Sequence, residues 1–146
     1  MGEKMIYFKR LTKEATVIAK KYEGDAGFDC FSCEDYELDP LERHSFALGF
    51  AVEIPHGTVL LVCEKSGMAQ KDGIMTIGNV IDATYRGECH VILVNLSNNV
   101  VYIKKYQKIA QMLLIMCATK KDIVQIVSKL SETERGDGGF GSTGQF

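Results

Sequence analysis

The stretch FALGFAVEI, residues 46–54, decides the fold class, because its large apolar residues recur at every second position. Smaller or polar residues separate them; the recurring residues are Phe46, Leu48, Phe50, Val52 and Ile54. Successive side chains of a β-strand point to opposite faces, so a period of two predicts one strand with a single buried face. The run ends at Pro55 and Gly57, which are typical of a turn.

Further short runs continue this extended pattern along the chain. We expect strands at residues 58–63, 89–96, 100–103, 109–117 and 123–127. The run CHVILVNL at 89–96 is rich in branched residues and indicates a strand buried on both faces. A helix of one or two turns is expected at residues 66–71. Many short strands with frequent turns predict an all-β antiparallel sandwich or barrel.

The composition indicates one domain and argues against several classes of partner. The chain has 146 residues, of which 46% are hydrophobic and 25% charged, with a net charge of −2. This balance argues against a broad basic surface for nucleic acid or anionic membrane. We see no run that approaches the ~18 apolar residues of a membrane helix. Five cysteines without a visible signal peptide predict reduced thiols and a cytoplasmic setting, with a viral or nuclear one also open.

Two segments in the first half of the chain could bind charged groups. Residues 24–29, GDAGFD, indicate a turn entering a strand, and they could also hold one of their two carboxylates near a cation. In residues 64–67, EKSG, a serine at the start of a helix usually caps it. The Ser66 hydroxyl, the Lys65 ammonium and the backbone N–H groups could instead bind an anion. The residues alone leave both alternatives open.

Two later segments place polar groups beside apolar ones. In residues 79–88, NVIDATYRGE, an apolar pair could anchor a hairpin arm with Asp82 at its tip and Tyr85 just after it. An exposed turn aspartate is the simpler interpretation, and a general base is the functional one. Gln111, inside the apolar run IAQM, must satisfy its hydrogen bonds either as a network residue or as a ligand contact.

The last twelve residues, RGDGGFGSTGQF (135–146), cannot build a core, because five of them are glycine. By composition they are typical of a floppy terminus. The glycines would also let backbone N–H groups approach phosphate, and Arg135 offers a planar fork for phosphate oxygens. Phe140 offers a face for a planar ring. Together the five segments favour one ligand that combines a planar base, a sugar and several phosphates with a divalent ion.

In their order, these segments resemble the five motifs of the trimeric dUTP nucleotidohydrolase (dUTPase) family. DAGFD resembles the first motif, KSGMA the second, NVIDATYRGE the third, IAQ the fourth and RGDGGFGSTG the fifth. The resemblance implies a jelly-roll-like antiparallel barrel over residues 1–134 and a flexible glycine-rich arm over residues 135–146 that closes the active site. It also implies a homotrimer with shared active sites, dUTP as substrate, Mg²⁺ as cofactor, and no nucleic-acid or membrane partner.

The implied reaction is hydrolysis of dUTP to dUMP and pyrophosphate, which keeps uracil out of DNA. By this resemblance, Asp82 would activate a water for in-line attack on the α-phosphorus, and Asp29 would act on Mg²⁺ through water only. Tyr85 would exclude a ribose 2′-hydroxyl, and a hairpin from about Asn79 to His90 would read uracil through its backbone. The implied substrate-binding residues are Lys65, Ser66, Gly67, Asn79, Ile81, Tyr85, His90, Gln111, Arg135, Gly139, Phe140, Gly141, Ser142 and Thr143.

The chain departs from the family pattern at a few positions. Lys65 stands where the family usually has arginine, and Glu64 where it usually has proline. Asn79 replaces a common glycine, and asparagine tolerates left-handed backbone better than most residues. Residues 106–108, YQK, replace the common Gly-Asp-Arg. Two alternatives therefore accompany the leading hypothesis: a dCTP deaminase-like enzyme, and a non-catalytic dUTP-binding or regulatory protein on the same scaffold.

Overall fold

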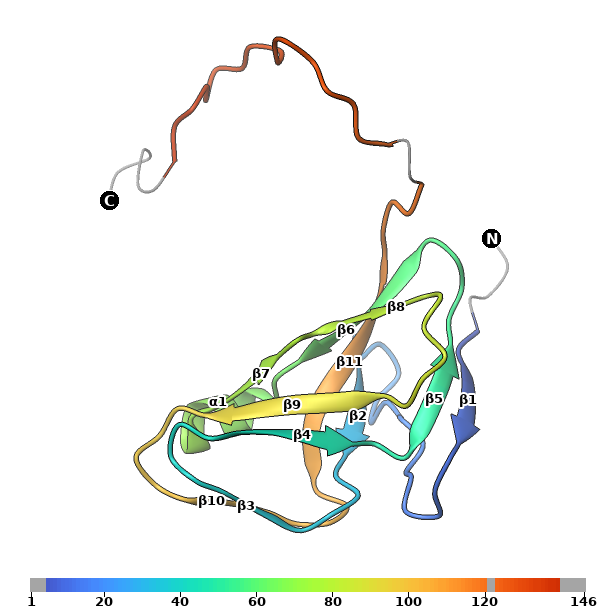
Figure 1. The fold of residues 1–146 in the computed structure, drawn as a ribbon, viewed down its shortest axis with the longest axis vertical. Coiled ribbons are helices and arrows are strands. Elements are labelled where there is room, and N and C mark those ends of the chain that lie inside the picture. Colours follow the sequence, from blue (N-terminus) through green and yellow to red (C-terminus); the bar gives the residue numbers. More distant parts are fainter. Residues whose placement is uncertain (1–4, 121–122, 140–146) are drawn as a thin grey trace.

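The structure, a computed structural model, describes residues 5–120 and 123–139 and consists of short antiparallel strands with one short helix (Figure 1). In chain order the elements are β1 (Tyr7–Arg10), β2 (Gly27–Phe31), β3 (Tyr36–Leu38), β4 (Arg43–Ala47), β5 (Phe50–Glu53), β6 (Thr58–Cys63), α1 (Ser66–Asp72), β7 (Ile74–Ile77), β8 (Val80–Asp82), β9 (His90–Asn95), β10 (Val101–Ile103) and β11 (Lys108–Met116). The expected strands at 58–63, 100–103 and 109–117 and the expected helix at 66–71 are thus confirmed to within one residue at each end.

The strands form sheets around one hydrophobic core. A four-stranded sheet has the order β2-β11-β6-β8, a three-stranded sheet the order β4-β9-β7, and two ribbons pair β1 with β5 and β3 with β10. Phe46, Leu60, Leu93 and Met112, from four different strands, are fully buried in a single cluster. Burying each such side chain contributes roughly 1.5–3 kcal/mol, so the sheets are held together mainly through this interior. The predicted all-β antiparallel fold is confirmed.

The stretch that decides the fold class is two strands rather than one. All five alternating apolar residues are buried, as predicted. However, β4 ends at Ala47 and pairs with β9, whereas β5 begins at Phe50 and pairs with β1. Between them Gly49 has a φ of 70°, a left-handed conformation that favours glycine. The chain therefore turns a corner at Gly49 and passes from one sheet to another while its large side chains stay in the same core.

Three further expectations are wrong in detail. β9 is buried fully on only one face, because Val91 and Leu93 have no exposure whereas Ile92 and Val94 are half-buried and His90 is exposed. Residues 123–127 do not form a strand, and their side chains are exposed. Residues 79–90 are not a paired hairpin, because β8 pairs with β6 whereas β9 pairs with β4 and β7.

The cysteines behave as the thiols that the sequence predicts. All five are free, with Cys30 and Cys89 buried. Burial raises the pKa of Cys89 to about 11, with the charge of Glu88 adding to the shift. A neutral buried thiol is a poor nucleophile, so Cys30 and Cys89 belong to the packing of the core.

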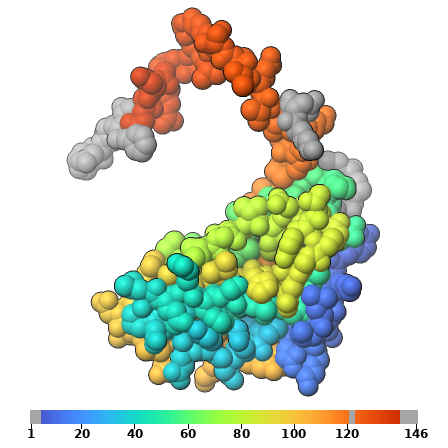
Figure 2. Space-filling view, viewed as in Figure 1, coloured from blue at the N-terminus to red at the C-terminus, as the bar shows by residue number. Residues whose placement is uncertain are grey.

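The chain beyond β11 leaves the body of the molecule. The N–H of Cys117 still donates to the carbonyl of Gly57, at 2.9 Å, and the following residues extend away from the sheets (Figures 1 and 2). This segment exposes large apolar side chains: Val124 is 82% exposed, Ile126 98% and Leu130 80%. Among the described residues, no helix has the length and apolar character required to cross a membrane.

Candidate functional site

A polar cavity at one end of the β2-β11-β6-β8 sheet collects the charged residues of the first, second and fourth motifs. We name it the lysine pocket; its volume is about 310 Å³, and its lining consists of Lys21, Asp25, Ala26, Gly27, Asp29, Lys65, Lys108 and Gln111. Antiparallel pairing of β2 with β11 sets Asp29 opposite Gln111. Lys65 follows β6, which lies on the other side of β11. Residues distant in the sequence thus converge through strand register.

Asp29 is the electrostatic centre of the lysine pocket. It is only 8% exposed, and its two carboxylate oxygens accept from two ammonium groups, Lys65 Nζ at 2.5 Å and Lys108 Nζ at 2.7 Å. Burial acts to raise the pKa of Asp29, but the hydrogen bonds and charges of the two lysines outweigh it and hold the pKa below its usual value. The sequence predicts a carboxylate near a cation, and here the cations are two lysines of the same chain. Lys65, which stands where the family usually has arginine, supplies one of these positive charges.

The Gln111 side chain packs beside Gly27, which leaves room for it. Its Nε2 donates to the backbone carbonyl of Glu64, at 3.1 Å. A Cβ built on Gly27 would lie 2.4 Å from Gln111 Oε1, so a side chain at that position would require the amide to shift. The Gln111 side chain is therefore fixed between β2 and the end of β6, with its carbonyl oxygen toward Gly27.

The start of α1 does not use the serine cap that the sequence suggests. Lys65 is the N-cap residue, and it makes no side-chain capping hydrogen bond. Ser66 is the first residue of the helix, and both Ser66 and Gly67 are exposed. Because the Ser66 hydroxyl does not cap its own helix, the first turn is open to solvent beside the lysine pocket.

A second cavity of about 190 Å³ contains the catalytic candidate and most of its predicted neighbours. We name it the Asp82 pocket; its lining consists of Gly78, Val80, Ile81, Asp82, Tyr85, Glu88, Cys89, His90 and Ile92. A turn directly after β8 brings Tyr85 back, because its N–H donates to the Asp82 carbonyl at 3.0 Å. The Tyr85 hydroxyl donates to the Glu88 carbonyl at 3.1 Å, which fixes the ring across the loop.

Asn79 lies outside the lining of the Asp82 pocket. Its backbone carbonyl accepts from Val62 N–H at 2.8 Å, and the left-handed residue at this turn is Gly78, with a φ of 67°. Asn79 therefore does not use the left-handed tolerance of asparagine, because the preceding glycine takes that conformation. In the described part of the chain, Asn79 Oδ1 is a buried side-chain oxygen without a hydrogen-bond partner.

Asp82 and Gln111 lie beside different ends of the same strand. Gln111 pairs with Cys63 of β6, and Asp82 pairs with Val59 of β6. These β6 residues are four positions apart, which corresponds to about 13 Å along a strand. One copy of the chain therefore does not bring Asp82 and the lysine pocket together around one small ligand.

The described part of the terminal arm extends away from the sheets that form both cavities (Figure 1). Arg135 is exposed, and its Nε donates to the carbonyl of Gly138 at 2.9 Å within the arm. Gly139 is also exposed. The predictions for Phe140, Gly141, Ser142 and Thr143 fall outside the described residues.

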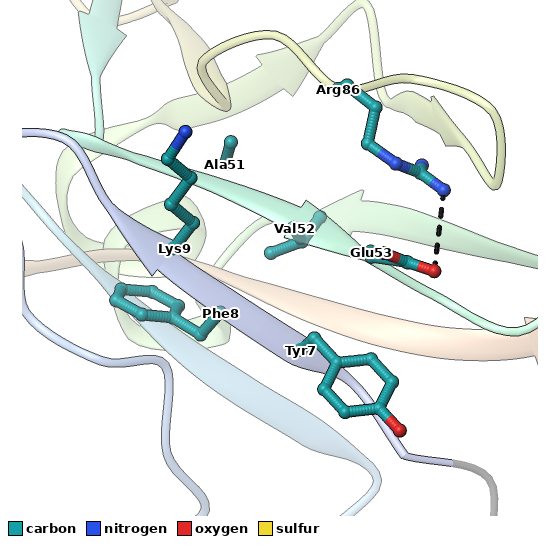
Figure 3. Close-up of a pocket in the computed structure, with 7 residues that line it drawn as sticks. All are labelled: Tyr7, Phe8, Lys9, Ala51, Val52, Glu53 and Arg86. Atoms are coloured by element: carbon teal, nitrogen blue, oxygen red, sulfur yellow. Dashed lines mark ion pairs between the residues drawn. The ribbon is translucent and has the colours of Figure 1, made fainter.

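Sequence reasoning missed two features. Lys108, which belongs to the segment YQK that departs from the family pattern, was not predicted to be a site residue, although the consecutive apolar pair Ile109 and Ala110 breaks the alternation just after it. The second is a cavity of about 230 Å³ beside the β1–β5 ribbon, lined by Tyr7, Phe8, Lys9, Ala51, Val52, Glu53 and Arg86. Figure 3 shows Arg86 reaching toward Glu53, at 3.7 Å.

The donor groups fit a magnesium ion that arrives with phosphates rather than one caged by protein. Among residues 5–120 and 123–139, no three His, Cys, Asp or Glu side chains converge on one point. Asp29, the buried carboxylate of the lysine pocket, already accepts from two lysines. Mg²⁺ commonly keeps several waters and binds to substrate phosphates with few carboxylates. The available role for this chain is thus one carboxylate acting through water.

Comparison with known proteins agrees with this arrangement. The dUTPase family model matches residues 13–144. The deoxyuridine 5′-triphosphate nucleotidohydrolase of Clostridium kluyveri is 41% identical over 138 residues, which cover 93% of this chain and 95% of the relative. The enzyme of that name from Paramecium bursaria Chlorella virus 1 is 40% identical over 136 residues, with coverage of 93% and 95%.

A solved structure extends the likeness to the fold. The dUTPase of Staphylococcus bacteriophage 80alpha, determined with dUpNHpp, superposes with a TM-score of 0.87 at 28% identity, over 96% of this chain and 98% of that one. The predicted dUTPase-like fold is confirmed by this match. With five motifs in order, this fold and this degree of identity, the chain belongs to the dUTPase family and is a deoxyuridine 5′-triphosphate nucleotidohydrolase.

Proposed function

We propose that the chain hydrolyses dUTP to dUMP and pyrophosphate with Asp82 as the general base. Asp82 is exposed at the end of β8 and lines a cavity with Tyr85, so its carboxylate can receive a water beside a bound sugar. The base takes a proton from that water as the oxygen attacks the α-phosphorus in line, and pyrophosphate leaves. Removing dUTP in this way keeps uracil out of DNA. The free thiols are compatible with the cytoplasmic setting that we propose.

The Asp82 pocket supports selection of a deoxyuridine. The Tyr85 ring is fixed through its hydroxyl, and against a deoxyribose it would leave no room for a 2′-hydroxyl. β8 is an edge strand of its sheet, so its outer backbone groups can pair with the imide edge of uracil. Ile81 and His90 line the same cavity. Cytosine reverses one donor and would leave backbone groups unpaired.

The lysine pocket supports binding of the triphosphate. Lys65, the Ser66 hydroxyl, the N–H groups near Gly67 and the Gln111 amide lie around one open cavity and the first turn of α1. Enzymes of this family use Mg²⁺. The ion would neutralise phosphate charge and polarise the α-phosphate. Asp29 would reach it through water, once the triphosphate competes for the lysines that Asp29 now holds.

The active unit that we propose is a homotrimer with shared sites. Because Asp82 and the lysine pocket lie at opposite ends of β6, a site needs them from different copies. The exposed apolar side chains of the segment after β11 support contact with another copy, because isolated chains rarely leave such residues in water. The arm from Arg135 onward would close over a neighbour's site, Arg135 gripping the γ-phosphate and Phe140 covering uracil. We keep the division between residues 1–134 and 135–146 as a prediction.

The observation that carries this proposal is the Asp82 pocket, in which a carboxylate and a fixed tyrosine ring line one cavity. The decisive experiment measures pyrophosphate release from dUTP, dCTP, dTTP and UTP, with and without Mg²⁺. We expect Mg²⁺-dependent release from dUTP only. Asp82→Asn should lower kcat by about 100- to 10,000-fold while nucleotide binding persists. Ammonia release from dCTP would favour the deaminase, and full activity of Asp82→Asn would remove Asp82 as the base.

A further inference from the structure

β11 contains a β-bulge immediately before Gln111. Lys108 lies opposite Phe31 of β2 and Ala110 lies opposite Cys30, so Ile109 is one extra residue on β11. An extra residue reverses the alternation of side chains on either side of it. Accordingly Ile109 and Ala110 are both buried, although they are consecutive.

The bulge brings Lys108 to the face of the sheet that carries Asp29 and Gln111. Without it, Lys108 would share the buried face of Ala110 and Met112, because residues two apart in a strand point the same way. With the bulge, its Nζ lies 2.7 Å from Asp29 Oδ2, and Lys108 lines the lysine pocket with Gln111. Bulges are frequent beside active sites because they re-aim a side chain in this way.

The lysine pocket contains more positive charge than a single structural ion pair with Asp29 requires. Asp29 accepts from Lys65 on one oxygen and from Lys108 on the other, so two cations share one carboxylate. The whole lining carries three lysines against two aspartates. The Lys108 side chain is 45% exposed, which leaves its ammonium accessible from the cavity. Excess positive charge in a concave site favours an anionic ligand.

We propose that Lys108 is a further triphosphate-binding residue of this enzyme. In the free chain Asp29 holds the ammonium group at the rim of the pocket, and on nucleotide binding the ammonium turns to a phosphate oxygen. Lys108 thus supplies a second lysine beside Lys65 on the phosphate side of the site. This inference rests on the proposed function of the lysine pocket and adds a residue that none of its assigned contacts includes.

The test compares three variants with the wild-type chain by calorimetric binding of dUpNHpp, with and without Mg²⁺. Lys108→Met should weaken binding by about tenfold, the loss of one charge-assisted hydrogen bond. Lys108→Arg should restore affinity to within about threefold, since it keeps the charge. Lys104→Met, which removes an exposed lysine outside the pocket lining, is the control and should bind as wild type. Binding to Lys108→Met should also weaken less as salt is raised.

A purely structural ion pair predicts a different pattern. Lys108→Met would then lower the melting temperature without nucleotide, while its affinity for dUpNHpp equalled that of Lys104→Met; this result would overturn the proposal. Because the readout is binding of an analogue, it is independent of turnover. Absence of pyrophosphate release by the wild-type chain would count against the proposed function, whereas unchanged binding by Lys108→Met counts only against Lys108.

Discussion

Single residues determine how the charged and polar groups of the lysine pocket are arranged. Asp29 is nearly buried, yet it is stabilised as a carboxylate because two ammonium groups surround it. Gln111 can occupy its position because Gly27 has no side chain. Both effects come from the register of β2 against β11, and each can be tested by one substitution.

The ion pairs of Asp29 make the stability of the folded protein depend on pH. A carboxyl whose folded pKa lies below its unfolded value stabilises the native state at higher pH. Here the contribution should be fully present above about pH 4 and be lost as pH falls through the lowered pKa of Asp29, whose ordinary value is 3.8. Melting temperatures of the wild type and Asp29→Asn, measured across this range at one protein concentration, should differ most near neutrality and converge in acid. A constant difference would contradict this assignment.

Gly27→Ala tests the room that Gln111 needs. The new methyl group would collide with the Gln111 amide and displace it from its hydrogen bond to the Glu64 carbonyl. If that amide holds phosphate, KM for dUTP should rise by about fivefold, the worth of one hydrogen bond. The effect should be absent in a Gln111→Ala background, since the two changes act on the same contact. Equal effects in both backgrounds would show that Gly27 acts in another way.

At the scale of elements, β6 sets the distance between Asp82 and Gln111. It pairs with β11 over its whole length and with β8 at residues 59–61, so that Gln111 lies beside Cys63 and Asp82 beside Val59. The corner at Gly49 has a comparable organising role, because it passes the chain from β4 to β5. The corner is held on both sides: the Gly49 carbonyl accepts from Leu11 N–H at 2.7 Å, and its N–H donates to Glu88 at 2.9 Å.

Gly49→Ala should destabilise the fold at this corner. Alanine at a φ of 70° is strained, and its Cβ would lie 2.4 Å from Thr12 Oγ1. We expect a cost of about 2 kcal/mol, which lowers the melting temperature by roughly 4–8 °C in a chain of this size. Gly67→Ala is the matched control, since no atom lies within 4 Å of its Cβ and alanine favours a helix. Equal melting of both variants would mean that the corner tolerates a side chain.

At the scale of the whole molecule, the separation of the cavities predicts that activity requires assembly. Asp82→Asn and a chain lacking residues 135–146 should each be inactive alone. If a site takes its base and its arm from different copies, randomly mixed trimers of the two should regain roughly a quarter of wild-type activity. Co-refolding followed by a pyrophosphate assay measures this. Mixtures that stay inactive would show that both elements serve a site within one copy.

The sequence by itself determined the fold class and the resemblance to the family, and it supplied the candidate site residues. Alternating apolar residues predict strands because side chains alternate across a sheet. Ordered motifs resemble a family because specific chemistry needs specific groups such as Asp82, Tyr85 and Gln111. Such patterns involve residues that are close together in the sequence, so they can be recognised without knowing how the chain folds.

Only the tertiary structure decided how these groups are arranged. The corner at Gly49, the position of Lys108 beside Asp29 and the absence of a paired hairpin after Asn79 all depend on which strand pairs with which. Strands that pair are distant in the sequence, and a single extra residue such as Ile109 moves the neighbouring side chains to the other face of the sheet. The separation of Asp82 from Gln111 follows from the same register, because Asp82 pairs with Val59 and Gln111 pairs with Cys63 of β6.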